Sequence, residues 1–201
     1  MPKLKICGLK RPVDISYCNP LAIDYVGFIV DFPKSQRSIT IDTLKQLSQD
    51  VDPKIQKVGV FVNYPLEVIA DLLNEGVIDI AQLHGQESPA DIIYLQNLTN
   101  KSIWKAFAIN EASDLAKAKA SPADQILLDY KEAGSGKSFN WELLEDFDRP
   151  FILAGGLNAT NIQVAMTQVH PAGLDLSTGV ENQGYKDPDK IKEIVRMVKN
   201  V

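Results

Sequence analysis

The stretch Lys3-Leu4-Lys5-Ile6-Cys7-Gly8-Leu9 places a short apolar strand ahead of a glycine, and it is the first of eight similar runs. The runs recur at intervals of roughly 20 to 30 residues, a spacing typical of repeated strand–helix units. They are Leu4–Cys7, Tyr25–Val30, Lys57–Val62, Ile80–Leu83, Ile103–Ala108, Gln125–Leu128, Phe151–Ala154 and Gly173–Leu176. Apolar strands that alternate with helices predict a parallel sheet covered by helices.

Most segments between the runs have the spacing of amphipathic helices. Leu66, Ile69, Ala70 and Leu73 recur at i, i+3, i+4 and i+7, and Ser88-Pro89 and Asp187-Pro188 are typical helix starts. The expected helices cover residues 42–47, 66–73, 88–98, 111–120, 160–169 and 191–198. We predict one (β/α)8 barrel domain over residues 1–201, and an open doubly wound sheet is the alternative with the same pattern. A short irregular element is expected over residues 139–147, after the sixth strand.

Composition excludes several classes of partner. The 201 residues carry a net charge of −5 without a long basic run, so we expect no nucleic acid and no membrane surface as partner. No apolar run approaches the roughly 20 residues of a membrane helix, and no secretory leader is visible. The two cysteines, Cys7 and Cys18, match neither a disulfide framework nor a zinc site. We expect a soluble, cytoplasmic protein, for which an anionic small substrate remains possible.

Polar residues gather where the predicted strands end, which is where the active site of such a barrel lies. These residues are Cys7, Asp31, Arg37, Asn63, His84, Asp129, Gly155-Gly156 and Ser177-Thr178-Gly179. A lone cysteine is more often a small buried hydrophobe, and a lone aspartate is more often a turn residue. At one barrel mouth, however, Cys7 and Asp129 form a candidate acid–base couple, because burial favours a protonated carboxyl group and a thiolate abstracts protons.

Glycine-containing loops follow the last two predicted strands. Gly155-Gly156 lets the backbone approach a ligand closely, and Ser177-Thr178-Gly179 adds hydroxyl and amide donors. The loops after strands 7 and 8 form the recurrent phosphate site of these barrels, so we prefer phosphate binding over a pair of ordinary turns.

Two other residues have weaker signals. Arg37 offers a planar fork for a carboxylate but is equally compatible with an exposed loop arginine, and His84 alone is more often structural. The only other histidine, His170, falls at the opposite end of its unit, so we expect no metal centre. Gly134-Ser135-Gly136-Lys137-Ser138 looks like a nucleotide phosphate loop, but Lys131 stands where that motif needs glycine, so we expect no ATP site.

Together these motifs resemble the phosphoribosylanthranilate isomerases of tryptophan biosynthesis, in order and over essentially the whole chain. The matching segments are Lys5–Leu9, Gly27–Ile29, Pro33–Arg37, Val58–Phe61, Gln82–Gly85, Leu127–Asp129, Phe139–Trp141, Ala154–Leu157 and Asp175–Glu181. The chain departs mildly from the family at Ala133–Gly136, which has one glycine fewer, and at Asn140 and Thr178.

The resemblance implies a cofactor-independent Amadori rearrangement of N-(5-phosphoribosyl)anthranilate, an aminoaldose, to an aminoketose. By this likeness Asp129 would protonate the ring oxygen and Cys7 would remove the proton from the sugar C2. Arg37 would face the anthranilate carboxylate and His84 would line the site. The phosphate would be held by Gly155, Gly156, Ser177, Thr178 and Gly179.

Two other functions remain open from the sequence. The first is another phosphosugar barrel enzyme, although an epimerase would need several histidines and an indole-forming lyase would need catalytic lysines, for which Lys105 is the only near candidate. The second is a non-catalytic phosphate-binding barrel, because fold alone does not fix function. The protein is expected to act as a monomer or a homodimer on a small phosphosugar.

Overall fold

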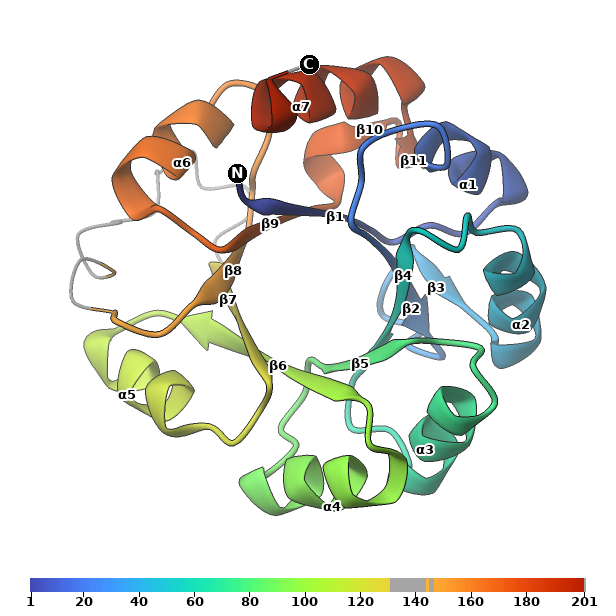
Figure 1. Ribbon diagram of the computed structural model, residues 1–201, viewed down its shortest axis with the longest axis vertical. Coiled ribbons are helices and arrows are strands. Elements are labelled where there is room, and N and C mark those ends of the chain that lie inside the picture. Colours follow the sequence, from blue (N-terminus) through green and yellow to red (C-terminus); the bar gives the residue numbers. More distant parts are fainter. Residues whose placement is uncertain (131–143, 145–146, 201) are drawn as a thin grey trace.

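Eight parallel strands close into a barrel in the computed structural model, which describes residues 1–130, 144 and 147–200 (Figure 1). The elements are β1 (Lys3–Cys7), α1 (Pro12–Cys18), β2 (Tyr25–Val30), β3 (Ser38–Ile39), α2 (Ile41–Gln49), β4 (Gln56–Phe61), α3 (Leu66–Asn74), β5 (Ile80–Leu83), α4 (Pro89–Thr99), β6 (Ser102–Ile109), α5 (Ala112–Ala120), β7 (Gln125–Tyr130), β8 (Phe151–Ala154), α6 (Ile162–Val169), β9 (Gly173–Leu176), the 3-10 helix η2 (Thr178–Val180), β10 (Glu181–Asn182), β11 (Tyr185–Lys186) and α7 (Pro188–Lys199).

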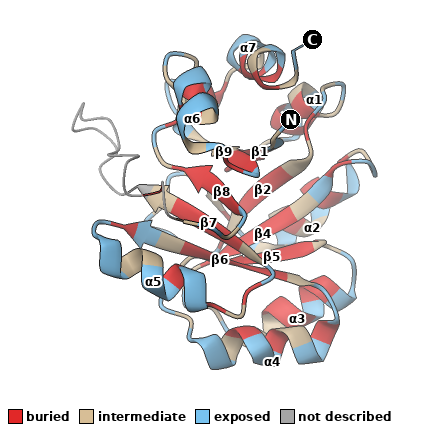
Figure 2. Ribbon diagram, turned by 60° about the vertical axis from the view of Figure 1, so that its left-hand side comes forward, coloured by how far each residue is buried: buried red, intermediate tan, exposed pale blue. Residues whose placement is uncertain are grey.

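The barrel follows the order β1-β9-β8-β7-β6-β5-β4-β2 and closes by the pairing of β1 with β2. The short strand β3 lengthens the sheet beside β2. The predicted barrel is therefore confirmed, and the open doubly wound sheet is wrong. Helices surround the strands on the outside (Figure 1), and the strand residues are mostly buried while the outer helix faces are exposed (Figure 2). In the described ranges no helix has the length and apolar character needed to cross a membrane.

Side chains alternate between two cores, because successive strand residues point to opposite faces of the sheet. Leu4 and Ile6 pack in the large core between strands and helices, whereas Cys7 belongs to the smaller core inside the barrel. The interior core is mostly apolar, with Tyr25 and Trp104 meeting edge to face at a centroid distance of 4.9 Å. Burial of each large apolar side chain in these layers contributes about 1.5–3 kcal/mol.

The predicted helix starts are confirmed. Ser88 is the N-cap of α4, where its hydroxyl accepts a hydrogen bond from the Asp91 amide at 3.3 Å. Asp187 is the N-cap of α7 and accepts from the amides of Asp189 and Lys190. Such caps satisfy amides that have no partner within the helix.

Four elements were not predicted: α1, β3, the short 3-10 helix η2 and the β10–β11 hairpin. Helix α1 has only seven residues, and its first-turn Asp14 is buried rather than exposed, which obscures an amphipathic pattern. The hairpin turns at Gln183 and Gly184, both with positive φ, and its two-residue strands are too short to show alternation. The element expected over 139–147 lies outside the described residues except for Leu144 and Phe147, and the phosphate-loop lookalike at 134–138 lies wholly outside them.

Candidate active site

The predicted site residues lie at the carboxyl ends of the barrel strands. Several of them belong to two clusters of contacting side chains, which also include residues that were not predicted. The thiol cluster contains Cys7, Lys5, Asp175, Arg37, Ser177, Glu181 and Lys186, and the acid cluster contains Asp129, His84 and Gln82. Asp129 belongs to β7, which is three strands from β1 round the barrel, so the two clusters face the mouth from different walls. Asp129 lies within β7 rather than just beyond it, since the strand continues to Tyr130.

Cys7 ends β1 and is only 7% exposed. Lys5, two residues earlier, also turns into the barrel, and its side chain is completely buried. The ammonium of Lys5 donates a hydrogen bond to Asp175 Oδ2 at 2.9 Å, across the pairing of β1 with β9. A Cβ placed on Gly27 of β2 would lie 2.7 Å from Cys7 Sγ and 3.1 Å from Lys5 Nζ. The missing side chain of Gly27 therefore makes room for a thiol and an ammonium side by side.

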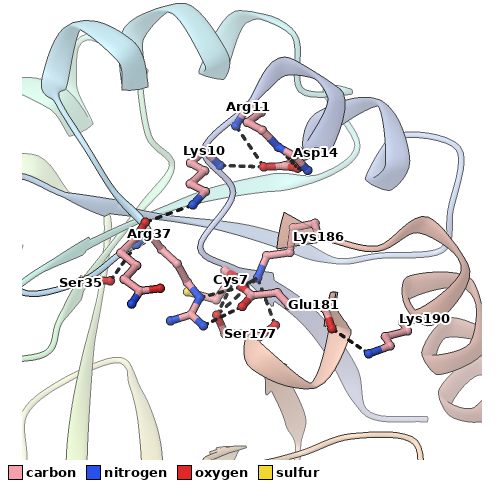
Figure 3. Close-up of polar contacts among 11 residues, drawn as sticks. Cys7, Lys10, Arg11, Asp14, Ser35, Arg37, Ser177, Glu181, Lys186 and Lys190 are labelled. Carbon is pink, nitrogen blue, oxygen red and sulfur yellow. Dashed lines mark hydrogen bonds and ion pairs between the residues drawn. The ribbon is translucent and has the colours of Figure 1, made fainter. Parts of the chain in front are cut away.

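Arg37 and Lys186 share one carboxylate at the rim of the thiol cluster (Figure 3). Arg37 donates to Glu181 through Nε at 2.6 Å and through Nη2 at 2.7 Å, and Lys186 Nζ donates to Glu181 Oε1 at 2.6 Å. The Lys186 side chain is 1% exposed. It is delivered by the β10–β11 hairpin, so an element that the sequence did not reveal completes the site.

Ser177 connects the β10–β11 hairpin to β1, the strand that carries Cys7. Its hydroxyl donates to the carbonyl of Cys7 at 3.0 Å, while Lys186 Nζ donates to the Ser177 carbonyl at 3.1 Å. The Ser177 hydroxyl is thus engaged with the backbone of Cys7.

Burial and charge oppose each other at the thiol. Burial has the largest effect and keeps the pKa of Cys7 above its ordinary value. The Lys5 ammonium and Lys186 act to lower that pKa, and the Asp175 carboxylate acts to raise it. Burial alone would lower the pKa of Lys5, but Asp175 and Cys7 outweigh it and keep that pKa above its ordinary value. Lys5 is therefore a stable cation next to the thiol.

Burial and neighbouring charges also have opposite effects on the pKa values of Lys186 and Glu181. Burial lowers the pKa of Lys186, with Glu181 opposing the change. Burial would raise the pKa of Glu181, yet hydrogen bonds from Arg37 and Lys186 hold it below its ordinary value. Glu181 is consequently ionised between two cations.

In the acid cluster, Asp129 contacts His84. The distance from His84 Nε2 to Asp129 Oδ2 is 3.3 Å, and Gln82 Nε2 lies 3.0 Å from His84 Nδ1. When the Gln82 amide donates to Nδ1, the imidazole proton is assigned to Nε2, the ring nitrogen that lies nearer to Asp129. The Asp129 side chain is 31% exposed, so its surroundings are wetter than the sequence suggested, and a histidine accompanies it instead.

The glycine loops lie against each other. Gly155 and Gly156 both have positive φ, at 94° and 62°, which explains why glycine occupies the turn after β8. A Cβ on Gly179 would overlap the carbonyl oxygen of Leu157, so the loop after β9 packs directly on the loop after β8. The side chains of Asn158 and Asn161 brace the first loop by donating to the Gly156 carbonyl, each at 3.1 Å.

Lys105, the only near candidate for the catalytic lysine of an indole-forming lyase, forms contacts with the segment that follows β5. Its ammonium donates to the Gly85 carbonyl at 2.8 Å and to Glu87 Oε2 at 3.1 Å. Its strand neighbours Trp104 and Ala106 face the barrel interior, so Lys105 points outward. In the described ranges no cluster of three or more His, Cys, Asp or Glu residues could hold a metal ion.

Lys5, Asp175, Gln82, Glu181 and Lys186 were not predicted as members of the site. For Lys5 and Asp175 a signal existed: each interrupts an apolar strand at a single position, as in Leu4-Lys5-Ile6 and Leu174-Asp175-Leu176. The first and last strands of a closed barrel must pair, so opposite charges at these positions indicate an internal ion pair.

Comparison with known proteins identifies the family. Residues 4–197 match the family model described as N-(5'phosphoribosyl)anthranilate (PRA) isomerase. The N-(5'-phosphoribosyl)anthranilate isomerase of Thermoanaerobacter sp. (strain X514) is 42% identical over 210 residues, and that of Clostridium kluyveri (strain ATCC 8527) is 40% identical over 203 residues, with full coverage of both chains in each case.

Solved structures agree with this assignment. The phosphoribosyl anthranilate isomerase of Thermotoga maritima superimposes with a TM-score of 0.90 at 34% identity, over 100% of both chains. A phosphoribosyl anthranilate isomerase in complex with reduced 1-(o-carboxyphenylamino)-1-deoxyribulose 5-phosphate superimposes with a TM-score of 0.88 at 32% identity, again over both whole chains. This chain belongs to the family of N-(5'-phosphoribosyl)anthranilate isomerases, enzymes of tryptophan biosynthesis that catalyse an aldose–ketose Amadori rearrangement.

Proposed function

We propose that this protein carries out the family reaction with Cys7 as general base and Asp129 as general acid. The observation that carries the proposal is geometric: a thiol beside the Lys5 ammonium and a carboxyl group beside a histidine lie at one barrel mouth. A group that can give up a proton and a group that can accept one, both facing the same mouth, can perform both halves of an acid–base reaction.

In the first step, the Asp129 carboxyl group gives its proton to the furanose ring oxygen. The bond from C1 to that oxygen breaks, and the nitrogen lone pair forms an iminium with C1. Oδ2 of Asp129 is the oxygen near His84, so Oδ1 remains for the proton that is transferred. His84 thereby holds the carboxyl group in its working orientation.

In the second step, the Cys7 thiolate takes the proton from C2. The C–H electron pair forms the C1–C2 double bond, and the iminium π electrons return to nitrogen, which gives an enolamine. The enolamine becomes the ketone when its hydroxyl proton leaves and C1 gains a proton. The iminium makes the C2 proton acidic enough for a thiolate, so the chemistry requires no metal or organic cofactor.

Binding residues surround this couple. Glu181 occupies the Nε and Nη2 atoms of Arg37, so we assign the Nη1 side of the guanidinium to the anthranilate carboxylate. His84 lines the ring side of the site. The phosphate is assigned to the packed glycine loops, with Gly155, Gly156, Ser177, Thr178 and Gly179 as its ligands. Because the Ser177 hydroxyl bonds the Cys7 carbonyl, its contribution comes from the backbone.

The substrate is accordingly a small phosphosugar, in keeping with the product-like ligand in the related complex. We further propose a single-domain cytoplasmic enzyme that works as a monomer or a homodimer. A dimeric relative from Thermotoga maritima has also been crystallised as generated monomers.

The test follows anthranilate fluorescence while phosphoribosylanthranilate is generated in situ and the purified protein is added last. Wild type should accelerate the loss of substrate, and Cys7→Ala and Asp129→Asn should each lower kcat by about 10²-fold or more, as expected for a lost acid–base group. Cys18→Ala is the matched control, because Cys18 is buried in the outer core, away from the mouth. Normal turnover in Cys7→Ala would refute the assignment of the base.

A further inference from the structure

A buried ion pair lies beneath the proposed base and has no part in the reaction steps above. Lys5 and Asp175 face each other inside the barrel, with side chains 0% and 9% exposed. One oxygen of the pair, Asp175 Oδ1, is buried without a hydrogen-bond partner among the described residues. Transferring such a pair from water into a core carries a desolvation penalty that often exceeds its Coulombic gain, so stability alone does not account for it.

Geometry places the Lys5 ammonium close to the Cys7 sulfur. Both side chains leave β1 on its inner face, two residues apart, and both lie against the bare Cα of Gly27. A Cβ position on Gly27 lies 2.7 Å from Sγ and 3.1 Å from Nζ, so these two atoms are less than about 6 Å apart, within the range where an opposite charge stabilises a thiolate.

The other charges near Cys7 are less suited to this role. Lys186 on β11 and Arg37 after β2 both share Glu181, whose carboxylate offsets their charge towards the thiol. Asp175 on β9 is an anion and opposes a thiolate. Of the cations around the thiol, Lys5 has the largest favourable influence.

We propose that Lys5, held in place and kept charged by Asp175, is the cation that stabilises the thiolate of Cys7. This inference rests on the proposed function of Cys7 as the base. Lys5 does not touch the substrate: it is a positioning residue that acts through Cys7. Asp175 prevents Lys5 from losing its proton in the dry interior, where an isolated ammonium would be neutral.

The first experiment measures Cys7 directly. Protein labelled with [3-13C]cysteine gives one signal for each of two cysteines, and the signal lost in Cys7→Ala is that of Cys7. Cys18 does not interfere, because burial raises its pKa to about 12. Lys5→Met should move the titration midpoint of Cys7 to higher pH. Lys5→Met/Asp175→Asn should move it in the same direction but less far, because the loss of the Asp175 charge offsets part of the loss of Lys5, which has the larger effect. The double variant leaves no buried unpaired carboxylate that could unfold the single variant.

The second experiment measures turnover of the same variants against pH. The acidic limb of kcat should move to higher pH, with activity at pH 7 reduced about tenfold or more and largely regained in alkaline buffer, as removal of a nearby opposite charge requires. Lys3→Met is the matched control, since Lys3 lies at the start of the same strand but pairs with Asp24 and is 62% exposed. It should alter neither titration.

The outcomes separate the two proposals. An unchanged Cys7 midpoint in Lys5→Met/Asp175→Asn would overturn the inference, even if turnover fell. A kcat loss that is equal at every pH would also overturn it, because it would indicate a purely structural role. Full activity in Cys7→Ala would instead overturn the function of Cys7, while the titration of Cys7 would still decide whether Lys5 stabilises its thiolate.

Discussion

Replacing Glu181 with glutamine tests the rim of the thiol cluster. The substitution keeps the size of the side chain but removes the charge that Arg37 and Lys186 share. Lys186 is 1% exposed, so its ammonium would become a buried charge without a counter-ion. Breaking a buried pair in this way costs about 3–5 kcal/mol. We take about 3 kcal/mol, because the amide oxygen still accepts a hydrogen bond and Arg37 reaches the rim.

The decrease in the free energy of unfolding caused by Glu181→Gln should be large enough to measure without abolishing the fold. Domains of this size have unfolding free energies of about 5–15 kcal/mol, so Glu181→Gln should fold and should melt about 6–12 °C below wild type. Urea unfolding followed by circular dichroism gives the free energy directly. Glu75→Gln is the matched control, because Glu75 pairs with Lys45 in the open and its loss should leave stability almost unchanged.

The pH dependence follows from the direction of the Glu181 shift. Its pKa in the folded protein lies below the ordinary 4.5, so its stabilising effect is present above that value and is lost as the pH falls through the folded pKa. The difference in the free energy of unfolding between wild type and Glu181→Gln should thus have its full size at pH 7 and decrease in acid. Adding Lys186→Met should restore stability by removing the orphaned charge. If Glu181→Gln unfolds like wild type at pH 7, or the double variant is less stable than the single one, the reasoning is refuted.

Two glycine substitutions test the packing of the site. Gly27→Ala directs a methyl group at Cys7 Sγ and Lys5 Nζ, so kcat should fall about tenfold or more. Overpacking should also lower the free energy of unfolding by about 1–3 kcal/mol. A kcat equal to that of wild type would contradict the idea that Gly27 makes room for both side chains. Gly179→Ala directs a methyl group at the carbonyl of Leu157 and should part the two loops, raising KM about tenfold or more while kcat changes less. An unchanged KM would remove these loops from substrate binding.

The strands could be predicted well because the barrel repeats one simple pattern. Tyr25–Val30, Ile80–Leu83, Phe151–Ala154 and Gly173–Leu176 have the bounds expected from their apolar runs. Strand interiors of a parallel barrel are buried on both faces, so their sequences are nearly continuous apolar runs. The β10–β11 hairpin was missed because nothing in its short polar strands signals burial, although it delivers the buried Lys186.

The sequence predicted which polar residues lie at the strand ends, but not the charged residues that surround them. Cys7, His84 and Asp129 were recognised because a polar residue at the end of an apolar strand is conspicuous. Which side chains would contact one another depends on three-dimensional pairing: Arg37 meets Glu181 across 144 residues of sequence. His84 was expected only to line the site, yet it contacts Asp129 directly.

The packing of the barrel interior supports a functional role for the Lys5–Asp175 ion pair. Trp104, Leu127 and Ile152 fill it with apolar side chains, and an apolar pair of suitable volume in place of Lys5 and Asp175 would extend that packing. Such replacements of buried ion pairs are often neutral or stabilising, so a barrel selected for stability alone would have no reason to keep the pair. The position of Lys5 on the same strand face as Cys7, with Gly27 clearing the space between them, makes sense if the benefit lies in the chemistry of the thiol. Functional sites are where such exceptions to core packing are expected, and here the exception adjoins the proposed base.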